Sequence, residues 1–131
     1  MDGPIRLLVI DDDRLVRMDL AFTLNREGFA VDLASSAGEA LRLLGERTYA
    51  LVLSDIGLPD GNGIDILRAA KRSDPCIKFI LLTGSQTAVT PESVAHEGAE
   101  SLILKPFALA DLLERVRLAL GAPGGARGAQ A

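Results

Sequence analysis

Residues 5–13, Ile-Arg-Leu-Leu-Val-Ile-Asp-Asp-Asp, decide the fold of this chain. Five of the first six residues in this stretch are apolar, and three carboxylates follow without a break. A short apolar run bounded by polar residues is typical of a strand that is buried on both faces of a parallel sheet. The stretch therefore predicts a strand whose C-terminal end carries Asp11, Asp12 and Asp13 to one edge of a sheet.

Three adjacent acids need a compensating charge. Two ionised carboxylates about 4 Å apart repel each other by on the order of 4 kcal/mol at an effective dielectric constant of ~20. A folded chain keeps such a cluster when a cation neutralises it or when one acid stays protonated. The alternative is that unrelated surface acids follow a strand, and the rest of the chain decides between the two.

The composition narrows the class of protein. The chain has 131 residues, of which 48% are hydrophobic, and this fits one compact domain. The net charge is −4 without a basic stripe, which argues against direct nucleic-acid binding. A single cysteine, Cys76, excludes a disulfide within the chain and fits a reducing cytoplasm. The sequence shows neither a signal peptide nor an apolar run long enough to span a membrane, so we expect a cytoplasmic protein without membrane contact.

Strand-like and helix-like segments alternate along the chain. We expect strands at residues 5–10, 29–34, 49–54, 77–82 and 101–104, and helices at residues 14–27, 37–46, 64–72, 91–97 and 109–120. This alternation predicts an α/β fold with a doubly wound parallel sheet, covered by helices on both faces and joined by right-handed crossovers. Residues 1–120 are expected to form the domain, and the Gly/Ala-rich residues 121–131 a disordered tail or linker.

The first helix has a candidate cap and a candidate buried face. Asp13 is a plausible N-cap. Four apolar residues recur near the helical period and are expected to face the core: Leu15, Met18, Phe22 and Leu24. Two residues elsewhere are given structural roles. We expect Cys76 in or near the core, and the single histidine, His96, exposed or half-buried on a helix.

Reactive side chains follow four of the five predicted strands. The strand ends carry Asp11 and Asp12, then Asp55, then Thr83, then Lys105. Because the carboxyl ends of parallel strands share one edge, these groups are expected to meet in one crevice. Each group alone is a weak signal, since an acid after a strand is commonly a helix cap and a lone lysine is commonly solvated. Their combination indicates a site.

The donor set is suited to a hard cation and to phosphorus chemistry. Asp12 and Asp55, with Asp11 behind them, fit Mg²⁺, and the backbone carbonyl of Gly57 is a candidate further ligand. Asp55 ends the predicted central strand and is the candidate nucleophile toward phosphorus. Lys105 and the hydroxyl of Thr83 are placed to neutralise phosphoryl oxygens.

These residues resemble the receiver domain of two-component response regulators over residues 5–120. The motifs are the apolar strand before Asp11-Asp12, the loop from Asp55 through Leu58-Pro59 to Gly63, Thr83-Gly84, and Lys105-Pro106-Phe107. The resemblance implies a flavodoxin-like (βα)5 fold with strand order 2-1-3-4-5. It also implies that Asp55 accepts a phosphoryl group from a histidine kinase or a histidine phosphotransfer protein, with Mg²⁺ on Asp11 and Asp12 and the phosphoryl group on Thr83 and Lys105.

The resemblance also implies what happens after phosphorylation. A surface of the domain would change conformation so that it binds a downstream effector or a second copy of the chain. Hydrolysis would then remove the phosphoryl group. We expect the kinase to dock on the first helix and the loop after Lys105, with Val16 and Leu20 as candidate exposed contacts or, equally, core residues. One position departs from the family pattern. The aromatic switch residue expected three positions before the lysine is Leu102 here, so signal transmission is expected to differ.

The sequence is compatible with two other functions. Asp11-Asp12-Asp13 also fits the opening motif of haloacid-dehalogenase-like phosphatases, with Asp11 as nucleophile and Asp13 as acid-base. Leu15 and the short chain argue against this enzyme class. The second alternative is a receiver-like module that binds partners without being phosphorylated, although the intact acid cluster argues against it.

Overall fold

The structure is a computed structural model that describes residues 3–84 and 89–121. Its main sheet has five parallel strands, β1 (Arg6–Ile10), β2 (Ala30–Ala34), β3 (Leu51–Asp55), β6 (Lys78–Thr83) and β7 (Ser101–Leu104). Their order in the sheet is β2-β1-β3-β6-β7, which confirms the predicted order 2-1-3-4-5 for these strands. The predicted α/β class and doubly wound sheet are also confirmed.

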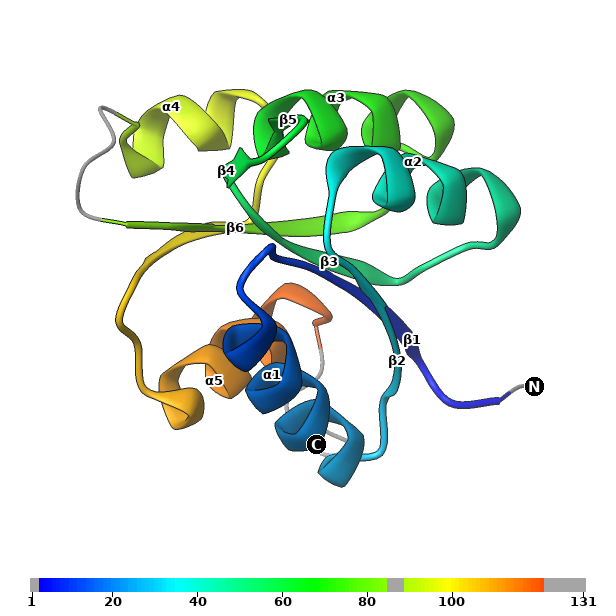
Figure 1. Cartoon of the computed structure of the whole chain (residues 1–131), viewed down its shortest axis with the longest axis vertical. Coiled ribbons are helices and arrows are strands. Elements are labelled where there is room, and N and C mark those ends of the chain that lie inside the picture. The colour runs from blue at the N-terminus through cyan, green and yellow to red at the C-terminus, as the bar shows by residue number, and fades with distance from the viewer. Residues whose placement is uncertain (1–2, 85–88, 122–131) are drawn as a thin grey trace.

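Helices cover both faces of the sheet (Figure 1). One layer contains α2 (Ala37–Glu46), α3 (Gly63–Ser73) and α4 (Pro91–His96), and the other contains α1 (Arg14–Arg26) and α5 (Leu109–Ala119). Alternate residues along each strand pack against the two helix layers. Leu8 and Val52 pack in the cluster with α2 and α3, whereas Leu7 and Leu53 pack in the cluster with α1 and α5. Both faces of β1 and β3 are therefore buried, as their apolar runs predict.

The segment after β3 contains structure beyond the predicted loop. Two short antiparallel strands, β4 (Gly57–Leu58) and β5 (Gly61–Asn62), form a ribbon before α3. Pro59 and Asp60 make the turn of this ribbon. At the end of the ribbon, the side chain of Asn62 accepts a hydrogen bond from the backbone N–H of Ile64 at 2.7 Å and caps α3. The ribbon holds the chain immediately after Asp55 in a defined conformation.

The predicted buried face of α1 was largely wrong. Leu20 and Leu24 are buried against the sheet and Val16 is half-buried, so the inward-facing residues recur every four positions. Leu15, Met18 and Phe22 are instead 75%, 51% and 65% exposed. Leu20 is consequently not an exposed contact. Apolar residues occur on both sides of this helix, so their spacing alone did not identify the side that meets the sheet.

Cys76 was also placed wrongly by the sequence. It is exposed and lies in the turn before β6. Its backbone N–H donates a hydrogen bond to the Asp74 side chain at 3.0 Å, a local contact that stabilises the turn. His96 is exposed at the end of α4, in agreement with its predicted surface position.

Two predictions concern residues that the structure describes only in part. The tail predicted from residue 121 falls outside the described residues from 122 onward. The domain boundary at residue 120 stays a prediction. Within the described residues, no helix has the length and apolar character required to cross a membrane.

Candidate functional site

Asp11 is an acid that is fully buried at the end of β1. Its carboxylate accepts a hydrogen bond from the backbone N–H of Asp13 at 2.9 Å. Its backbone carbonyl accepts a second hydrogen bond, from Nη1 of Arg17 at 2.7 Å. The first turn of α1 thus fixes both the side chain and the main chain of Asp11.

Asp13 has a different role from its two neighbours. Its carboxylate accepts hydrogen bonds from the backbone N–H groups of Leu15 at 2.9 Å and Val16 at 3.4 Å. These contacts confirm the predicted N-cap of α1. The Asp13 carboxylate is therefore engaged with the helix, and the third acid of the run serves the local fold.

Lys105 supplies the positive charge that the acids require. Its Nζ atom lies 2.7 Å from Oδ2 of Asp11 and 3.2 Å from Oδ2 of Asp55. The backbone N–H of Lys105 donates a hydrogen bond to the carbonyl of Thr83 at 2.7 Å, which ties the end of β7 to the end of β6. The ammonium group therefore sits between acids that come from β1 and β3.

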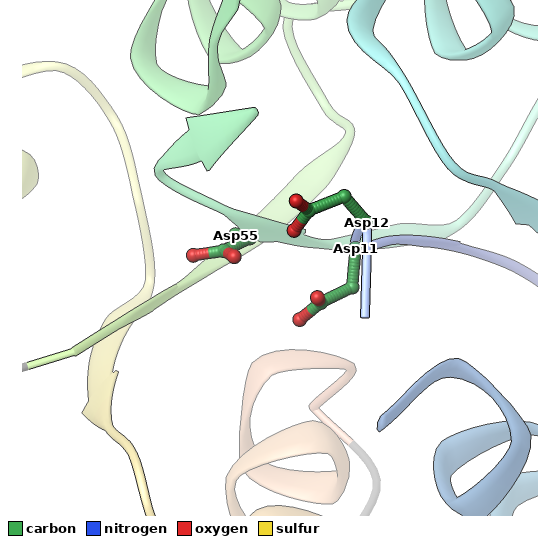
Figure 2. A group of neighbouring side chains, drawn as sticks. All are labelled: Asp11, Asp12 and Asp55. Atoms are coloured by element: carbon green, nitrogen blue, oxygen red, sulfur yellow. The ribbon is translucent and has the colours of Figure 1, made fainter. Parts of the chain in front are cut away.

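Asp11, Asp12 and Asp55 form one acidic cluster (Figure 2). Each contributes a carboxylate oxygen, and these oxygens all lie within 4.8 Å of one another. Asp12 is exposed, Asp55 is half-buried and Asp11 is buried, so the cluster opens toward solvent on one side. Carboxylate oxygens in this number suit a hard divalent cation such as Mg²⁺, which prefers oxygen ligands.

The electrostatics of the cluster affect two titrating groups. Burial raises the pKa of Asp55 above its ordinary value, and the charge of Asp11 raises it further, while Lys105 acts in the opposite direction. Burial alone would lower the pKa of Lys105, but its hydrogen bond to Asp11 and the charges of both acids raise the pKa overall. The lysine is therefore held in its charged form, and the ionised form of Asp55 is disfavoured until a further cation approaches.

Thr83 and Gly57 are the two remaining residues of the predicted site. Thr83 is the buried last residue of β6, one position beyond Leu82, which is the Cα partner of Asp55. The Thr83 hydroxyl donates a hydrogen bond to the carbonyl of Gly84 at 3.0 Å. Gly57 is exposed and begins β4, two residues beyond Asp55. The strand ends thus bring Asp11, Asp55 and Lys105 into direct contact and carry Thr83 to the same edge.

Gly63 and Arg17 contribute to the site in ways that the sequence did not reveal. A Cβ atom on Gly63 would lie 2.4 Å from the backbone oxygen of Asp55, which is closer than real contacts allow. In the sequence, Gly63 is recognisable only as part of a turn motif. The one sequence signal for Arg17 is a cation near the start of a helix that follows an acid-rich strand end.

Comparisons with known proteins agree with this geometry. The family model described as the response regulator receiver domain matches residues 7–117. The chain belongs to this family. Response regulators act as signalling switches in two-component systems and are not conventional enzymes. The family membership also accounts for the predicted flavodoxin-like fold.

Individual relatives match most of this chain. The transcriptional regulatory protein PmrA of Pectobacterium parmentieri is 36% identical over 113 residues, which are 86% of this chain and 51% of that protein. The transcriptional regulatory protein CusR of Escherichia coli K12 is 35% identical over 116 residues, 88% of this chain and 51% of that protein. The chain thus spans about half the length of the curated relatives it matches.

A solved structure matches over nearly the full length of both chains. The CheY-like receiver domain protein from Methanospirillum hungatei JF-1 has a TM-score of 0.85 and is 33% identical. The match covers 91% of this chain and 95% of that one. A receiver domain from Clostridium thermocellum gives a TM-score of 0.83 at 32% identity, over 89% of this chain and 94% of that one.

Proposed function

We propose that this receiver domain takes a phosphoryl group onto Asp55 from a phosphohistidine donor, and that Mg²⁺ is required. The observation that carries the proposal is the arrangement of Lys105, whose ammonium group contacts both Asp11 and Asp55. A nucleophilic carboxylate needs neighbouring cations when it meets a phosphoryl group that carries negative charge of its own. The site holds one such cation already and has the acids to bind a second.

Asp11, Asp12 and Asp55 would hold the Mg²⁺, and the backbone carbonyl of Gly57 is a further candidate ligand. The three carboxylates fit the ion because their oxygens lie within 4.8 Å of one another and because Asp12 keeps the cluster accessible. When bound, Mg²⁺ supplies charge neutralisation for the acids and for the phosphoryl oxygens. Receiver domains as a family typically bind Mg²⁺.

The transfer step involves only one bond formed and one bond broken. An oxygen of the Asp55 carboxylate attacks phosphorus in line with the phosphorus–nitrogen bond of the donor. That bond breaks, and its electron pair leaves with the imidazole, which accepts a proton. Water later attacks the same phosphorus, releases inorganic phosphate and regenerates Asp55, so the signal ends without another protein.

Lys105 and Thr83 are proposed to bind the phosphoryl group and to move in response to its charge. A phosphoryl group adds about −1.5 to −2 charges near neutral pH. Lys105 can keep its charge while its partner changes from Asp11 to a phosphoryl oxygen, and the Thr83 hydroxyl is the proposed second donor. Their movement would bias the surface of α4, β7 and α5 toward a downstream effector or a homodimer.

Leu102 stands where the family carries an aromatic switch residue. It is half-buried and packs against the core cluster that contains α2, α3 and α4. A leucine cannot swing inward as an aromatic ring does, so we propose that the signal passes along β7 by a different rearrangement. Structures with and without beryllofluoride test this proposal. An inward side-chain exchange at Leu102 would contradict it.

The phosphodonor is proposed to dock on α1 beside the site. The outer face of α1, defined here as Leu15, Met18 and Phe22, is apolar and exposed. Next to it, a cleft of about 390 Å³ lies between α1 and the loop after β7 and is lined in part by Lys105 and Phe107. A partner that covers both regions brings its histidine close to Asp55. The proposed contacts are therefore the residues of this outer face and the half-buried Val16, which lines the cleft, whereas Leu20 is fully buried.

The phosphorylation test uses acetyl phosphate and Mg²⁺ with intact-mass measurement. We expect the wild type to gain one phosphoryl group and Asp55→Asn to gain none. Asp13→Asn is the matched control, because asparagine also caps helices well and Asp13 faces α1. This variant should be labelled normally. An unlabelled wild type in the presence of Mg²⁺ would favour a receiver-like module that works without phosphorylation.

Docking of the phosphodonor protein can be tested separately from the phosphorylation of Asp55. Phe22→Ser should leave labelling by acetyl phosphate unchanged and slow transfer from phosphorylated histidine kinases of the same organism. Leu41→Ser is the control, because Leu41 is an exposed apolar residue of α2, on the opposite face of the sheet. Equal transfer rates for the two variants would contradict docking on α1. Gel filtration before and after labelling tests the proposed homodimer.

Three further expectations remain proposals. The receiver domain is proposed to occupy residues 1–120, the residues that follow are proposed to be a tail or linker, and the protein is proposed to work in the cytoplasm. The phosphatase alternative is not supported, because the Asp13 carboxylate that would serve as acid-base is engaged in capping α1.

A further inference from the structure

Asp60 connects the ribbon that follows Asp55 to a helix far away in the sequence. It lies in the turn between β4 and β5. Its carboxylate accepts hydrogen bonds from the backbone N–H groups of Ala37 at 2.7 Å and Gly38 at 3.0 Å, at the start of α2. The two amides hold the pKa of Asp60 below its ordinary value, with Gly38 making the larger contribution.

The start of α2 does not depend on Asp60 alone for a cap. The hydroxyl of Ser36 accepts a hydrogen bond from the backbone N–H of Glu39 at 3.2 Å, and the Glu39 side chain accepts one from the backbone N–H of Ser35 at 2.9 Å. The helix thus has an ordinary local cap. The Asp60 carboxylate satisfies two further N–H groups at this helix end, those of Ala37 and Gly38, and it brings a favourable negative charge to the helix N-terminus.

The ribbon and α2 approach each other closely at two glycines. A Cβ atom on Gly61 would lie 2.8 Å from the Cβ of Ala37, and one on Gly38 would lie 3.3 Å from Oδ2 of Asp60. Side chains at either position would push the ribbon away from the helix. The sequence in this region therefore permits the contact that the Asp60 carboxylate makes.

The other end of the ribbon is joined to the candidate site. The backbone N–H of Gly63 donates a hydrogen bond to the carbonyl of Ile56 at 2.8 Å, and Gly63 packs directly against the backbone of Asp55. Gly57 pairs with Asn62 across the ribbon. Each ribbon strand is only two residues long, so the position of Gly57 depends on how both ends of the ribbon are held.

We propose that Asp60 is a positioning residue for the Mg²⁺ and phosphoryl site. By fastening the tip of the ribbon to α2, its carboxylate fixes the Gly57 carbonyl relative to the three acids. The inference rests on the proposed function, since it assigns Asp60 a part in the same site. Asp60 itself is exposed at the ribbon tip and makes its contacts with α2, so it acts through the backbone of the ribbon.

The test compares two variants that each remove one cap from α2. Asp60→Ala frees the ribbon, whereas Ser36→Ala weakens the same helix end without touching the ribbon. Mg²⁺ affinity is measured directly by NMR titration of backbone amides, and hydrogen exchange at the Gly63 amide reports the order of the ribbon. Labelling by acetyl phosphate is then measured as a function of Mg²⁺ concentration.

We expect Asp60→Ala to bind Mg²⁺ about tenfold more weakly, at the lower end of what loss of a ligand's supporting contact costs. Exchange at Gly63 should accelerate, and the labelling rate at saturating Mg²⁺ should stay near that of the wild type. Ser36→Ala should retain wild-type affinity and exchange. Asp60→Asn, which keeps an acceptor oxygen, should fall between the two and provides the answer if Asp60→Ala does not fold.

Two results would overturn the inference. One is equal Mg²⁺ affinity in the Asp60 and Ser36 variants. The other is a lower labelling rate at saturating Mg²⁺ with unchanged affinity, which would place Asp60 outside the positioning of the metal ligands. A wild type that binds Mg²⁺ but is not labelled contradicts the proposed phosphorylation instead, and the NMR titration still decides the role of Asp60.

Discussion

The site edge of the sheet buries charge, whereas the outer face of α1 exposes apolar surface. At the site, the fully buried Asp11 is matched by Nζ of Lys105 at 2.7 Å and by the backbone N–H of Asp13 at 2.9 Å. On the outer face of α1, Phe22 has the guanidinium of Arg26 5.6 Å from its ring centroid and is otherwise largely open to solvent. Charged groups are ordinarily solvated and large apolar groups are ordinarily buried, so each region shows the reverse of the usual arrangement.

The two regions differ in whether the domain itself offsets the unfavourable exposure or burial. The charge at the site is compensated within the domain, because β1, β3 and β7 deliver acids and a lysine to one point. The apolar surface of α1 has no comparable cover among the described residues, and exposed apolar patches commonly mark protein–protein contacts. Substitutions at the site should therefore change stability, whereas substitutions on the outer face of α1 should change only partner binding.

The largest expected effect is at Lys105. Lys105→Met leaves Asp11 buried without its cation, and we expect a loss of unfolding free energy on the order of 4 kcal/mol, as for one partner removed from a buried ion pair. Chemical denaturation without Mg²⁺ measures the loss. Added Mg²⁺ should restore part of it, because the ion neutralises the same acids.

Lys78→Met is the matched control for that experiment. Lys78 is a half-buried lysine of the neighbouring strand β6 and forms no ion pair with the residues that the structure describes. Its substitution should change the unfolding free energy by less than about 0.5 kcal/mol. A similar loss for both variants would show that the Lys105 ammonium does not compensate Asp11.

The next effect tests which side of α1 meets the sheet. Leu20→Ala should cost about 3 kcal/mol, because it leaves a cavity in the core beside β1 and β3. Phe22→Ala removes a larger side chain but should cost less than about 0.5 kcal/mol, because Phe22 is exposed. Thermal or urea unfolding of the two variants decides the matter. The opposite ranking would restore the face of α1 that the apolar spacing first suggested.

The same pair of regions shows how much could be predicted from sequence. The site was predictable because its geometry follows from topology. Once Asp11, Asp55 and Lys105 are assigned to the ends of parallel strands, a common sheet edge brings them together whatever the details of packing. The observed contacts of Lys105 with both acids agree with that expectation.

The orientation of α1 was not predictable in this way. Its apolar residues support two overlapping stripes, one of which includes Leu15 and Phe22 and the other Val16 and Leu20. The observed rotation of the helix buries Leu20 and Leu24 and goes together with contacts at its start, where Asp13 caps the backbone and Arg17 donates to the carbonyl of Asp11. Such contacts depend on three-dimensional geometry, as does the contact of Asp60 with α2.

A smaller effect is expected from Gly63, which lies against the backbone of Asp55. Gly63→Ala should cost about 2 kcal/mol, since its Cβ would meet the Asp55 backbone oxygen at 2.4 Å and the chain would have to shift. Gly45→Ala is the control, because a Cβ there meets nothing within 4 Å and alanine favours the helix. The control should raise the melting temperature. If both variants were stabilised, the close approach of Gly63 to Asp55 would be refuted.

The smallest expected effect is a gain in stability from Asp55→Asn. Burial, and then the charge of Asp11, raise the pKa of Asp55 in the folded state above the ordinary pKa of an aspartate. The folded state therefore binds this proton more tightly than the unfolded state does. As the pH rises from below the ordinary pKa of an aspartate through the raised pKa of Asp55, the wild type loses stability.

The asparagine of Asp55→Asn has no ionisable carboxyl group and stays neutral. At neutral pH without Mg²⁺ this variant should therefore melt a few degrees above the wild type. The gain should disappear in acid, at pH values below the ordinary range of an aspartate. Melting temperatures of both proteins across that pH range provide the measurement. A difference that does not vary with pH would mean that the asparagine acts through packing, and that the buried charge of Asp55 does not oppose folding.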